Sequence, residues 1–213
     1  MEVVYALDEN YKTIDKDILG LYGDITYLDN TIETYGISYK DTWTVKRFLN
    51  GLSLKLNSRI KDIFNYLDLD IKYLDCRICD LSHTIFKYVM LSSLLLNNMR
   101  FIILDHFDAG LTYKAQKKLI NVINKMKDDG FNILVISNNF VFLSKAVDRL
   151  SIVEGGKEVF DGSIDELLLP KNRKYIKNTK IIDFIDEANE HKAKLKYTFD
   201  RNELLEDIYR SVG

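Results

Sequence analysis

Phe101-Ile102-Ile103-Leu104 is an apolar run that ends at the polar pair Asp105-His106. A second apolar run, residues 132–137, follows a turn signal at Gly130. Continuous apolar runs of this length, rich in β-branched residues, are typical of parallel strands covered on both faces. Between the two runs, residues 113–127 carry apolar side chains at helical spacing and lysines on the opposite face. The sequence therefore predicts a strand–helix–strand unit with a right-handed crossover.

Turn and cap signals mark the elements that follow this unit. Residues 150–153 and 158–160 flank the pair Gly155-Gly156, which predicts a tight β-hairpin. Ser163 then precedes an acidic first turn and is expected to cap a short helix. These signals extend the predicted sheet beyond its parallel core.

Two segments, one before this unit and one after the predicted hairpin, are expected to be mainly helical. Residues 42–96 show apolar side chains at helical spacing, so we expect a helical insertion before the strand that ends at Asp105. Pro170 marks a boundary, and residues 181–194 and 202–212 predict two further helices. The predicted fold class is α/β, with this helical insertion and a helical carboxyl-terminal part.

The composition gives no general preference for a charged partner. The 213 residues include 30 Lys and Arg against 32 Asp and Glu, a net charge of −2. Such a chain has no overall attraction to nucleic acid or to an anionic membrane surface. The longest apolar stretch, residues 88–96, is far shorter than the roughly 20 residues of a membrane-spanning helix. With only two cysteines and no signal-peptide pattern, we expect a soluble, cytosolic globular protein.

Two local patterns have both a functional and an ordinary interpretation. Cys76 and Cys79 form a CxxC pair that Asp80 and His83 could complete as a metal site, but free thiols are the commoner outcome without a second ligand pair. The basic stretch 171–180 could contact nucleic acid, but the acidic residues that follow favour a solvated face. We therefore expect neither a metal site nor a nucleic-acid partner.

Asp105 is the strongest single candidate for a ligand-binding residue. A carboxylate at the carboxyl end of a buried parallel strand lies where open α/β sheets bind ligands. In phosphate-binding sheets such an aspartate holds Mg²⁺, because this hard cation prefers oxygen ligands. The neighbouring sequence strengthens this interpretation.

The stretch from Leu81-Ser82-His83-Thr84-Ile85 to Asp105 resembles ABC (ATP-binding-cassette) transporter ATPases from their LSGGQ signature to the Walker B aspartate. Other segments resemble the same family in the same order: 25–30 the strand entering the Q-loop, 44–49 the start of the helical subdomain, 109–112 the D-loop, 134–139 the switch strand, 153–168 the following hairpin and helix, and 205–209 the tail of exporter-type members. The resemblance implies a parallel-sheet, P-loop-NTPase-like domain over residues 1–168, with a helical subdomain at about 42–97. Residues 169–213 would form a carboxyl-terminal helical extension.

The nucleotide-handling positions depart from the family pattern. No GxxxxGK[ST] motif occurs, and by family spacing the phosphate loop would fall before Met1. We therefore expect the first strand, the phosphate loop and its helix to be absent from this chain. His106 stands where the family has its catalytic glutamate, and Asn138 stands at the position of the switch histidine.

The vestigial ATP and magnesium site implied by the resemblance consists of Asn30, at the Q-loop glutamine position, Ser82 and Asp105. The two signature glycines are replaced by His83 and Thr84, whose side chains obstruct close approach of the backbone to a phosphate. Because phosphoryl transfer depends on positioning and electrostatics, these losses together argue against catalysis. We expect no catalytic residue, and no cofactor unless another chain supplies the missing loop for Mg-ATP.

The resemblance implies a degenerate, catalytically silent ATP-binding subunit of an ABC transporter. Such a subunit would dock on a transmembrane subunit or pair with another ABC ATPase subunit, as a homodimer or a heterodimer, on the cytoplasmic face of the cell membrane. Tyr35, Tyr39 and Trp43 make the segment after the Q-loop aromatic, which suits a helix-in-groove contact with the membrane subunit. The ordinary interpretation is that these rings cover the core.

Three alternatives stay open. The missing amino-terminal lobe could come from another chain or from a longer gene product, which would retain ATP binding. The chain could also be an ABC-like interaction protein without a transport role. A DNA-associated ATPase of the SMC and Rad50 type is disfavoured, because only residues 31–80 separate the Q-loop from the signature and no long heptad pattern occurs.

Overall fold

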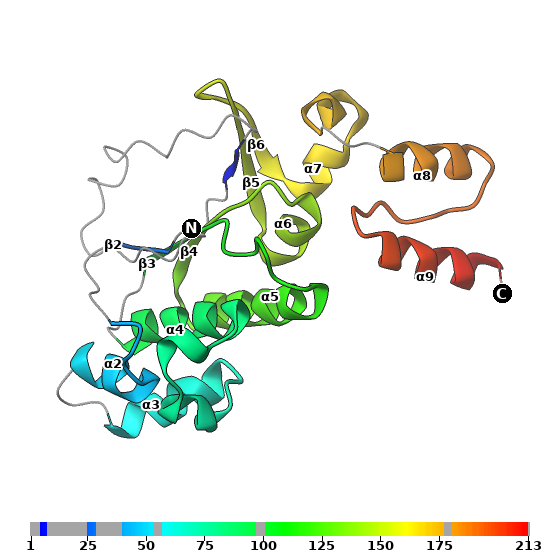
Figure 1. Ribbon diagram of the computed structural model, residues 1–213. Helices are drawn as coiled ribbons and strands as arrows, with labels where there is room; N and C mark the ends of the chain where they lie inside the picture. Colours follow the sequence, from blue (N-terminus) through cyan, green and yellow to red (C-terminus); the bar gives the residue numbers. More distant parts are fainter. Residues whose placement is uncertain are drawn as a thin grey trace.

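The computed structural model describes residues 5–7, 25–28, 40–52, 57–96, 101–176 and 180–212. Its described strands form one sheet in the order β2-β3-β4-β1-β5-β6, shown in Figure 1. The pairs from β2 to β5 are parallel, and β5 and β6 are antiparallel. The strands are β1 (Tyr5–Leu7), β2 (Ile25–Leu28), β3 (Phe101–Asp105), β4 (Asn132–Ile136), β5 (Arg149–Glu154) and β6 (Lys157–Ser163).

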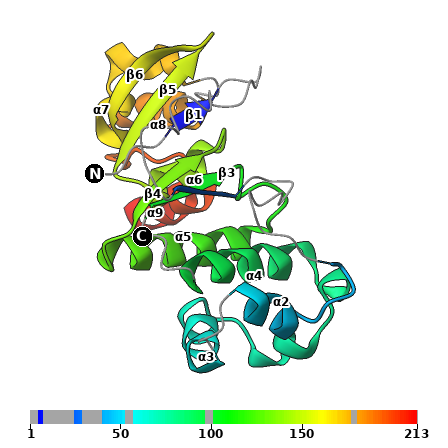
Figure 2. The ribbon, with the colours of Figure 1, turned by 90° about the vertical axis from the view of Figure 1, so that its left-hand side faces the viewer.

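Some helices pack against the sheet, and others extend from it at one side. The α-helices are α2 (Val45–Leu52), α3 (Asn57–Tyr66), α4 (His83–Leu96), α5 (Tyr113–Asp128), α6 (Phe140–Ala146), α7 (Ile164–Leu168), α8 (Lys180–Glu190) and α9 (Arg201–Val212), and short 3-10 helices span Ile71–Asp75, Ile78–Asp80 and Pro170–Tyr175. Figure 2 shows α4 and α5 against one face of the sheet, with α2 and α3 on the far side of α4. The helical insertion thus forms a separate layer.

The predicted strand–helix–strand unit is confirmed as β3, α5 and β4. The two strands pair in parallel, with Ile102 opposite Ile133 and Leu104 opposite Val135, and all four side chains are buried. The hydroxyl of Thr112 accepts the backbone N–H of Ala115 and caps α5. Because both strands run in the same direction, their carboxyl ends lie at one edge of the sheet.

The predicted hairpin and helix cap are also confirmed. Gly155 and Gly156 have φ values of +56° and +77°, and two successive left-handed residues form the turn that matches the twist of a β-hairpin. Ser163 and Glu166 form a reciprocal capping box at the start of α7. This hairpin places β6 at the edge of the sheet.

β1 was not expected. We expected the first strand of the nucleotide-binding lobe to be absent, yet Tyr5–Leu7 lies inside the sheet, parallel to β4 on one side and to β5 on the other. That expectation was wrong because a three-residue strand has almost no periodic pattern of its own. Its pairing partners, around Ile136 and Ser151, lie far along the chain from it.

The helical segment before β3 shares one hydrophobic core with the sheet. Phe48, Phe64 and Leu91 from α2, α3 and α4 belong to the same buried cluster as Ile102 and Leu104 of β3. Polar contacts also join α3 to α5, since the hydroxyl of Tyr66 donates to Asp129 at 2.6 Å. The insertion is therefore packed firmly against the sheet.

The carboxyl-terminal part adds the helical pair α8 and α9, which lie side by side in Figure 1. Ile185, Leu195 and Leu204 form a small buried cluster of their own. The predicted helix over 181–194 ends earlier, at Glu190, and Lys192 and Lys194 both have positive φ. A positive φ lies outside the right-handed helical region, so the helix cannot continue through these two residues and the chain turns there.

Candidate functional site

The carboxyl end of β3 carries the aspartate and histidine singled out by the sequence. The Nδ1 atom of His106 lies 2.5 Å from Oδ1 of Asp105, and the two side chains are only 18% and 16% exposed. The backbone N–H of His106 donates to the carbonyl oxygen of Ile136 in β4 at 2.7 Å. His106 has φ +48°, a left-handed conformation that is uncommon outside glycine. The imidazole is thus fixed against the carboxylate.

The hydrogen bond between these side chains matters for cation binding. Mg²⁺ takes oxygen ligands at close to ideal octahedral geometry. A cation at Oδ1 of Asp105 would have to displace the imidazole of His106. As arranged here, the pair fits a magnesium ion poorly, and no cluster of three or more potential metal ligands occurs among the described residues.

Ser82 and His83 lie at the start of α4. Ser82 is exposed, and its Oγ atom accepts the backbone N–H of Ile85 at 3.3 Å, so this hydroxyl serves the helix end. The imidazole of His83 packs beside Gly110, whose φ is +71°; a Cβ at Gly110 would lie 3.4 Å from Nε2 of His83. The pKa of His83 lies below its usual value, mainly because the side chain is partly buried and secondly because the charge of Lys87 is near.

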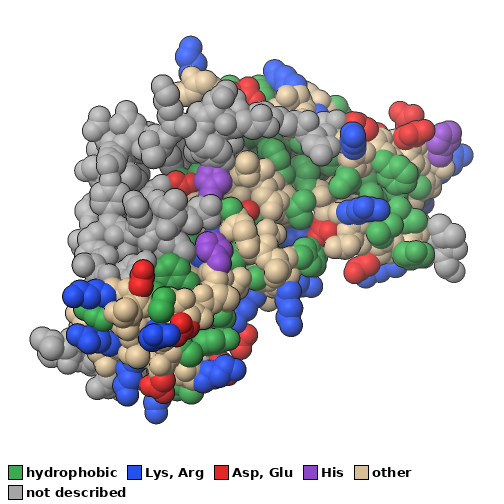
Figure 3. All heavy atoms as spheres, in the orientation of Figure 1, with side chains coloured by type: hydrophobic (Ala, Val, Ile, Leu, Met, Phe, Trp, Pro, Cys, Tyr) green, Lys and Arg blue, Asp and Glu red, His purple; other side chains and the backbone are tan. Residues whose placement is uncertain are grey.

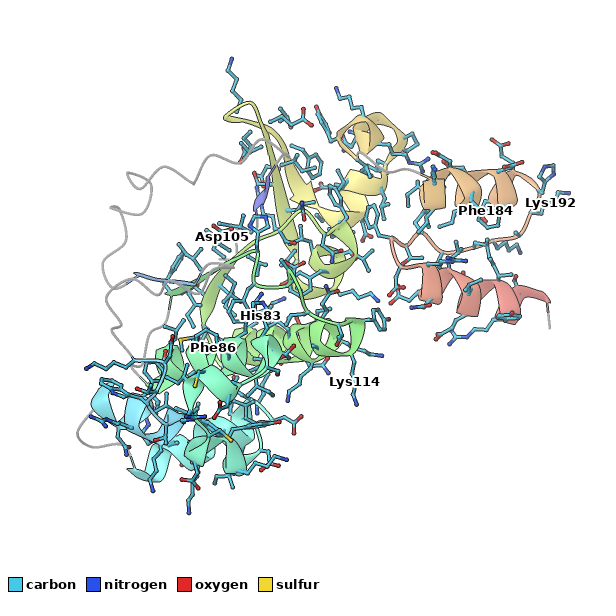
Figure 4. All side chains as sticks on the ribbon, viewed as in Figure 1. His83, Phe86, Asp105, Lys114, Phe184 and Lys192 are labelled. Atoms are coloured by element: carbon cyan, nitrogen blue, oxygen red, sulfur yellow. The ribbon has the colours of Figure 1, made fainter. Side chains whose placement is uncertain are left out.

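Figure 4 shows His83 and Asp105 on separate elements, at the start of α4 and the end of β3. In Figure 3 histidine side chains (purple) come to the surface on this face of the molecule. Together with the loop after β3, these elements form the described part of the candidate site.

Asn138 lies on the loop that follows β4, the strand next to β3. Its side chain is exposed. The adjacent Asn139, not Asn138, caps α6 by accepting the N–H of Phe142 at 3.2 Å, and Ser137 Oγ accepts the N–H of Asn139 at 3.0 Å. The structure therefore brings the Asn138 loop to the same sheet edge as Asp105.

Three candidate residues, Asn30, Tyr35 and Tyr39, lie outside the described residues. Trp43 is described and is partly buried against the main core. The guanidinium of Arg47 lies 5.0 Å from the centroid of its ring. The backbone carbonyl of Trp43 accepts the N–H of Ile78 at 2.9 Å, so the segment entering the helical layer is anchored beside the CxxC stretch.

Lys87 is a residue that sequence reasoning missed. It lies in α4 and is fully buried, and its Nζ atom donates to the carbonyl oxygens of Phe107 at 2.8 Å and Ala109 at 2.7 Å. The available signal was a lysine directly before the apolar stretch 88–96. This lysine joins α4 to the loop that follows β3.

Comparison with known proteins gives distant matches. No model of a protein family matches the chain. The energy-coupling factor transporter ATP-binding protein EcfA2 of Thermotoga maritima is 30% identical over 82 residues, 38% of this chain and 31% of that protein. The ribose import ATP-binding protein RbsA of Bacillus subtilis is 26% identical over 172 residues, 71% of this chain and 35% of that protein.

Solved structures show the same fold. CbiO1 from Clostridium perfringens, part of the ABC transporter complex cbiONQ, has a TM-score of 0.63 at 15% identity, covering 87% of each chain. A structure described as a metal-chelate type ABC transporter in an inward-facing conformation has a TM-score of 0.65 at 13% identity, covering 82% of this chain and 77% of that one.

The matched regions limit what these likenesses mean. The chain spans about a third of the length of the first two curated relatives. No helix in the described part of the chain is long and apolar enough to cross a membrane. The sequence matches and the two similar structures agree in one respect: the chain is a distant and partial homologue of the ATP-binding subunits of ABC transporters.

Proposed function

We propose that this protein is a degenerate ATP-binding subunit of an ABC transporter that does not hydrolyse ATP. It docks on a transmembrane subunit, or pairs with a competent ATPase subunit, at the cytoplasmic face of the cell membrane. The matches to import ATP-binding proteins and the likeness to a subunit of a transporter complex support the transport role. The substituted site residues support catalytic silence.

The bond between His106 and Asp105 is the observation on which catalytic silence rests. Asp105, in the magnesium position, forms a side-chain hydrogen bond with His106, which stands where the family has its catalytic glutamate. The imidazole lies where a cation would approach Oδ1, so Asp105 is not arranged for its family role of holding magnesium. Without a magnesium ion to hold the phosphates of ATP, a base at position 106 has no positioned substrate to act on.

ATP binding without hydrolysis is the second candidate function, and β1 favours it. A phosphate-binding loop follows a strand in a parallel sheet. β1 is such a strand, and the sequence after it contains Lys12 followed by Thr13, in the Lys-Thr order that ends the phosphate-loop motif. Residues 8–24 lie outside the described residues, so this candidate rests on β1 and on the sequence alone.

The test is to titrate the purified chain with Mg-ATP by calorimetry and to follow phosphate release. We expect no binding at micromolar concentrations and no turnover. Phosphate release that Asp105→Asn abolishes would contradict catalytic silence. Micromolar binding that Lys12→Ala abolishes, with no turnover, would establish the second candidate instead.

A further inference from the structure

Lys87 is a fully buried cation whose ammonium is directed at the backbone. It donates to the carbonyl oxygens of Phe107 and Ala109, in the loop of residues 106–111, and lies 5.3 Å from the ring centroid of Phe107. Taking an ammonium out of water is costly, so a buried lysine needs compensating hydrogen bonds. The two carbonyl oxygens provide them.

The loop itself is held from two sides. Lys87 reaches it from α4, while Nε2 of Gln116 reaches it from α5 and donates to the carbonyl oxygens of Asp108 at 3.3 Å and Leu111 at 3.5 Å. Inside the loop, the N–H of Ala109 bonds to His106 and the N–H of Leu111 bonds to Asp108. From α4 the imidazole of His83 also hydrogen-bonds to the backbone of Ala109, so Lys87 and His83 are both titratable side chains that hold the loop.

Burial lowers the pKa of Lys87 to about 8, although the nearby carboxylate of Asp108 acts in the opposite direction. Asp108 is 4% exposed, and its Oδ1 atom accepts no hydrogen bond from the described residues. Burial, and after it the charge of Lys87, lowers the pKa of His83 below its usual value of 6.5. His83 is therefore mostly neutral above pH 6.5, where Lys87 changes charge.

We propose that the buried ammonium of Lys87 clamps the loop of residues 106–111 to α4, and that the loop loosens when this ammonium loses its proton. Charged donors form hydrogen bonds about twice as strong as neutral ones, so the neutral amine holds the same carbonyl oxygens more weakly. Because the loop begins at His106, the charge on Lys87 sets how firmly the candidate site is held. This inference does not depend on the proposed transport role.

Nuclear magnetic resonance tests the clamp in the unmodified protein. The Cε resonance of Lys87 reports its protonation, and the exchange of the Ala109 and Leu111 amides, corrected for intrinsic rates, reports the loop. We expect Lys87 to titrate near pH 8 and both amides to lose about tenfold in protection between about pH 6.5 and pH 9. The amide of Val147, bonded to Leu143 in α6, serves as the internal reference.

Two variants separate Lys87 from other titratable side chains near the loop, including His83, Asp105 and His106. In Lys87→Arg the charge persists throughout this range, so protection should stay constant with pH. In Lys87→Met protection should already be low at pH 6.5 and fall no further. Unchanged protection in the wild type while Lys87 titrates, a Lys87 that stays charged to pH 10, or an equal loss of protection in Lys87→Met would overturn the proposal.

Discussion

Trp43 stands where the chain enters its helical layer, and its ring is neither fully buried nor free. One side of the ring packs on the main core, and Arg47 lies over it at 5.0 Å from the ring centroid. A partly exposed tryptophan next to a cation is the kind of anchor that interfaces use. The docking role proposed for this segment therefore depends on what this ring contacts in the assembled complex.

We expect Trp43→Ala to weaken association with the membrane partner by about 2 kcal/mol, as loss of a hot-spot aromatic does, with little change in melting temperature. Sedimentation with membrane vesicles from the source cells measures association, and thermal unfolding measures stability. Tyr73→Ala is the matched control, because Tyr73 is also partly buried in the helical layer, with Lys72 at 5.5 Å from its ring centroid. If Trp43→Ala unfolds the chain, or if both variants sediment like the wild type, the docking role fails.

At the site, sequence reasoning could identify side chains but not their mutual contacts. Asp105 and His106 were identified from an apolar run that ends in a carboxylate, and the structure places both at the carboxyl end of β3. The hydrogen bond between them depends on the positive φ of His106, which no pattern reveals. Lys87 was missed because a lysine beside an apolar run is normally solvated, and only the loop after β3 gives it acceptors.

Among the elements, those with strong local signals were predicted well. β3, β4 and the β5–β6 hairpin follow from continuous apolar runs and a Gly-Gly turn. α4 begins at His83, earlier than the predicted residue 86, because Ser82 accepts a backbone N–H and starts the helix. The missed strand β1 depends on hydrogen bonds to distant partners, so local sequence carries no sign of it.

The junction of β6 and α7 gives a prediction at the scale of one element. A Cβ at Gly162 would lie 2.5 Å from the carboxylate of Glu166 and 2.9 Å from the ring of Phe160. Glu166 closes the capping box on Ser163, so it must move and leave the helix end unsatisfied. We expect Gly162→Ala to reduce the free energy of unfolding by about 1–2 kcal/mol, from cap loss and overpacking.

Gly51 in α2 provides the contrasting substitution. Among the described residues outside its own helical turn, no atom lies within 4 Å of a Cβ placed there, and glycine in a helix is less favourable than alanine. Gly51→Ala should therefore raise the free energy of unfolding by roughly 0.5–1 kcal/mol. Urea unfolding of both variants compares the two; equal stability of Gly162→Ala and the wild type would contradict the capping argument.

Across the whole molecule, the carboxyl-terminal helices contact the sheet domain through Ile182 of α8, which lies in the main hydrophobic core, and through residues just before α9. Phe199 stacks on Phe140 with ring centroids 5.6 Å apart. Asp200, whose side chain is 3% exposed, forms an ion pair with Lys145 and accepts the hydroxyl of Tyr113 at 3.3 Å. Phe199 and Asp200 lie immediately before α9, so their contacts fix the position of the start of that helix.

The ion pair predicts a dependence on pH. Burial alone would raise the pKa of Asp200, but hydrogen bonds from Lys145 and from the backbone of Asn202 outweigh burial and lower it. A carboxyl with a lowered pKa stabilises the fold above its unfolded pKa of about 3.9 and loses this contribution as pH falls through the folded value. The attachment of α9 should therefore be retained at neutral pH and weaken below about pH 4.

Asp200→Asn tests this attachment at neutral pH. Lys145 keeps its ion pair with the more exposed Glu203, but its bond to the buried Asp200 loses one charge, so we expect the free energy of unfolding to fall by about 1–2 kcal/mol. Faster proteolytic cleavage near residues 192–200 should accompany it. Glu206→Gln is the control, because the Glu206–Arg210 pair is 70% and 76% exposed and spans 3.8 Å. If both variants resist protease like the wild type, the ion pair does not hold the extension.

The position of β1 has a consequence for how the chain is made. Tyr5–Leu7 leaves the ribosome before its partners around Ile136 and Ser151, which emerge only after the long intervening segment has been synthesised. Until then the centre of the sheet cannot close, whereas β3, α5 and β4 can associate as a local unit. Pairing over such sequence separations is slow, because loop-closure entropy is lost before the contacts form. The nascent chain therefore keeps a gap in its sheet, open to chaperones or to strands of other chains, until β5 arrives.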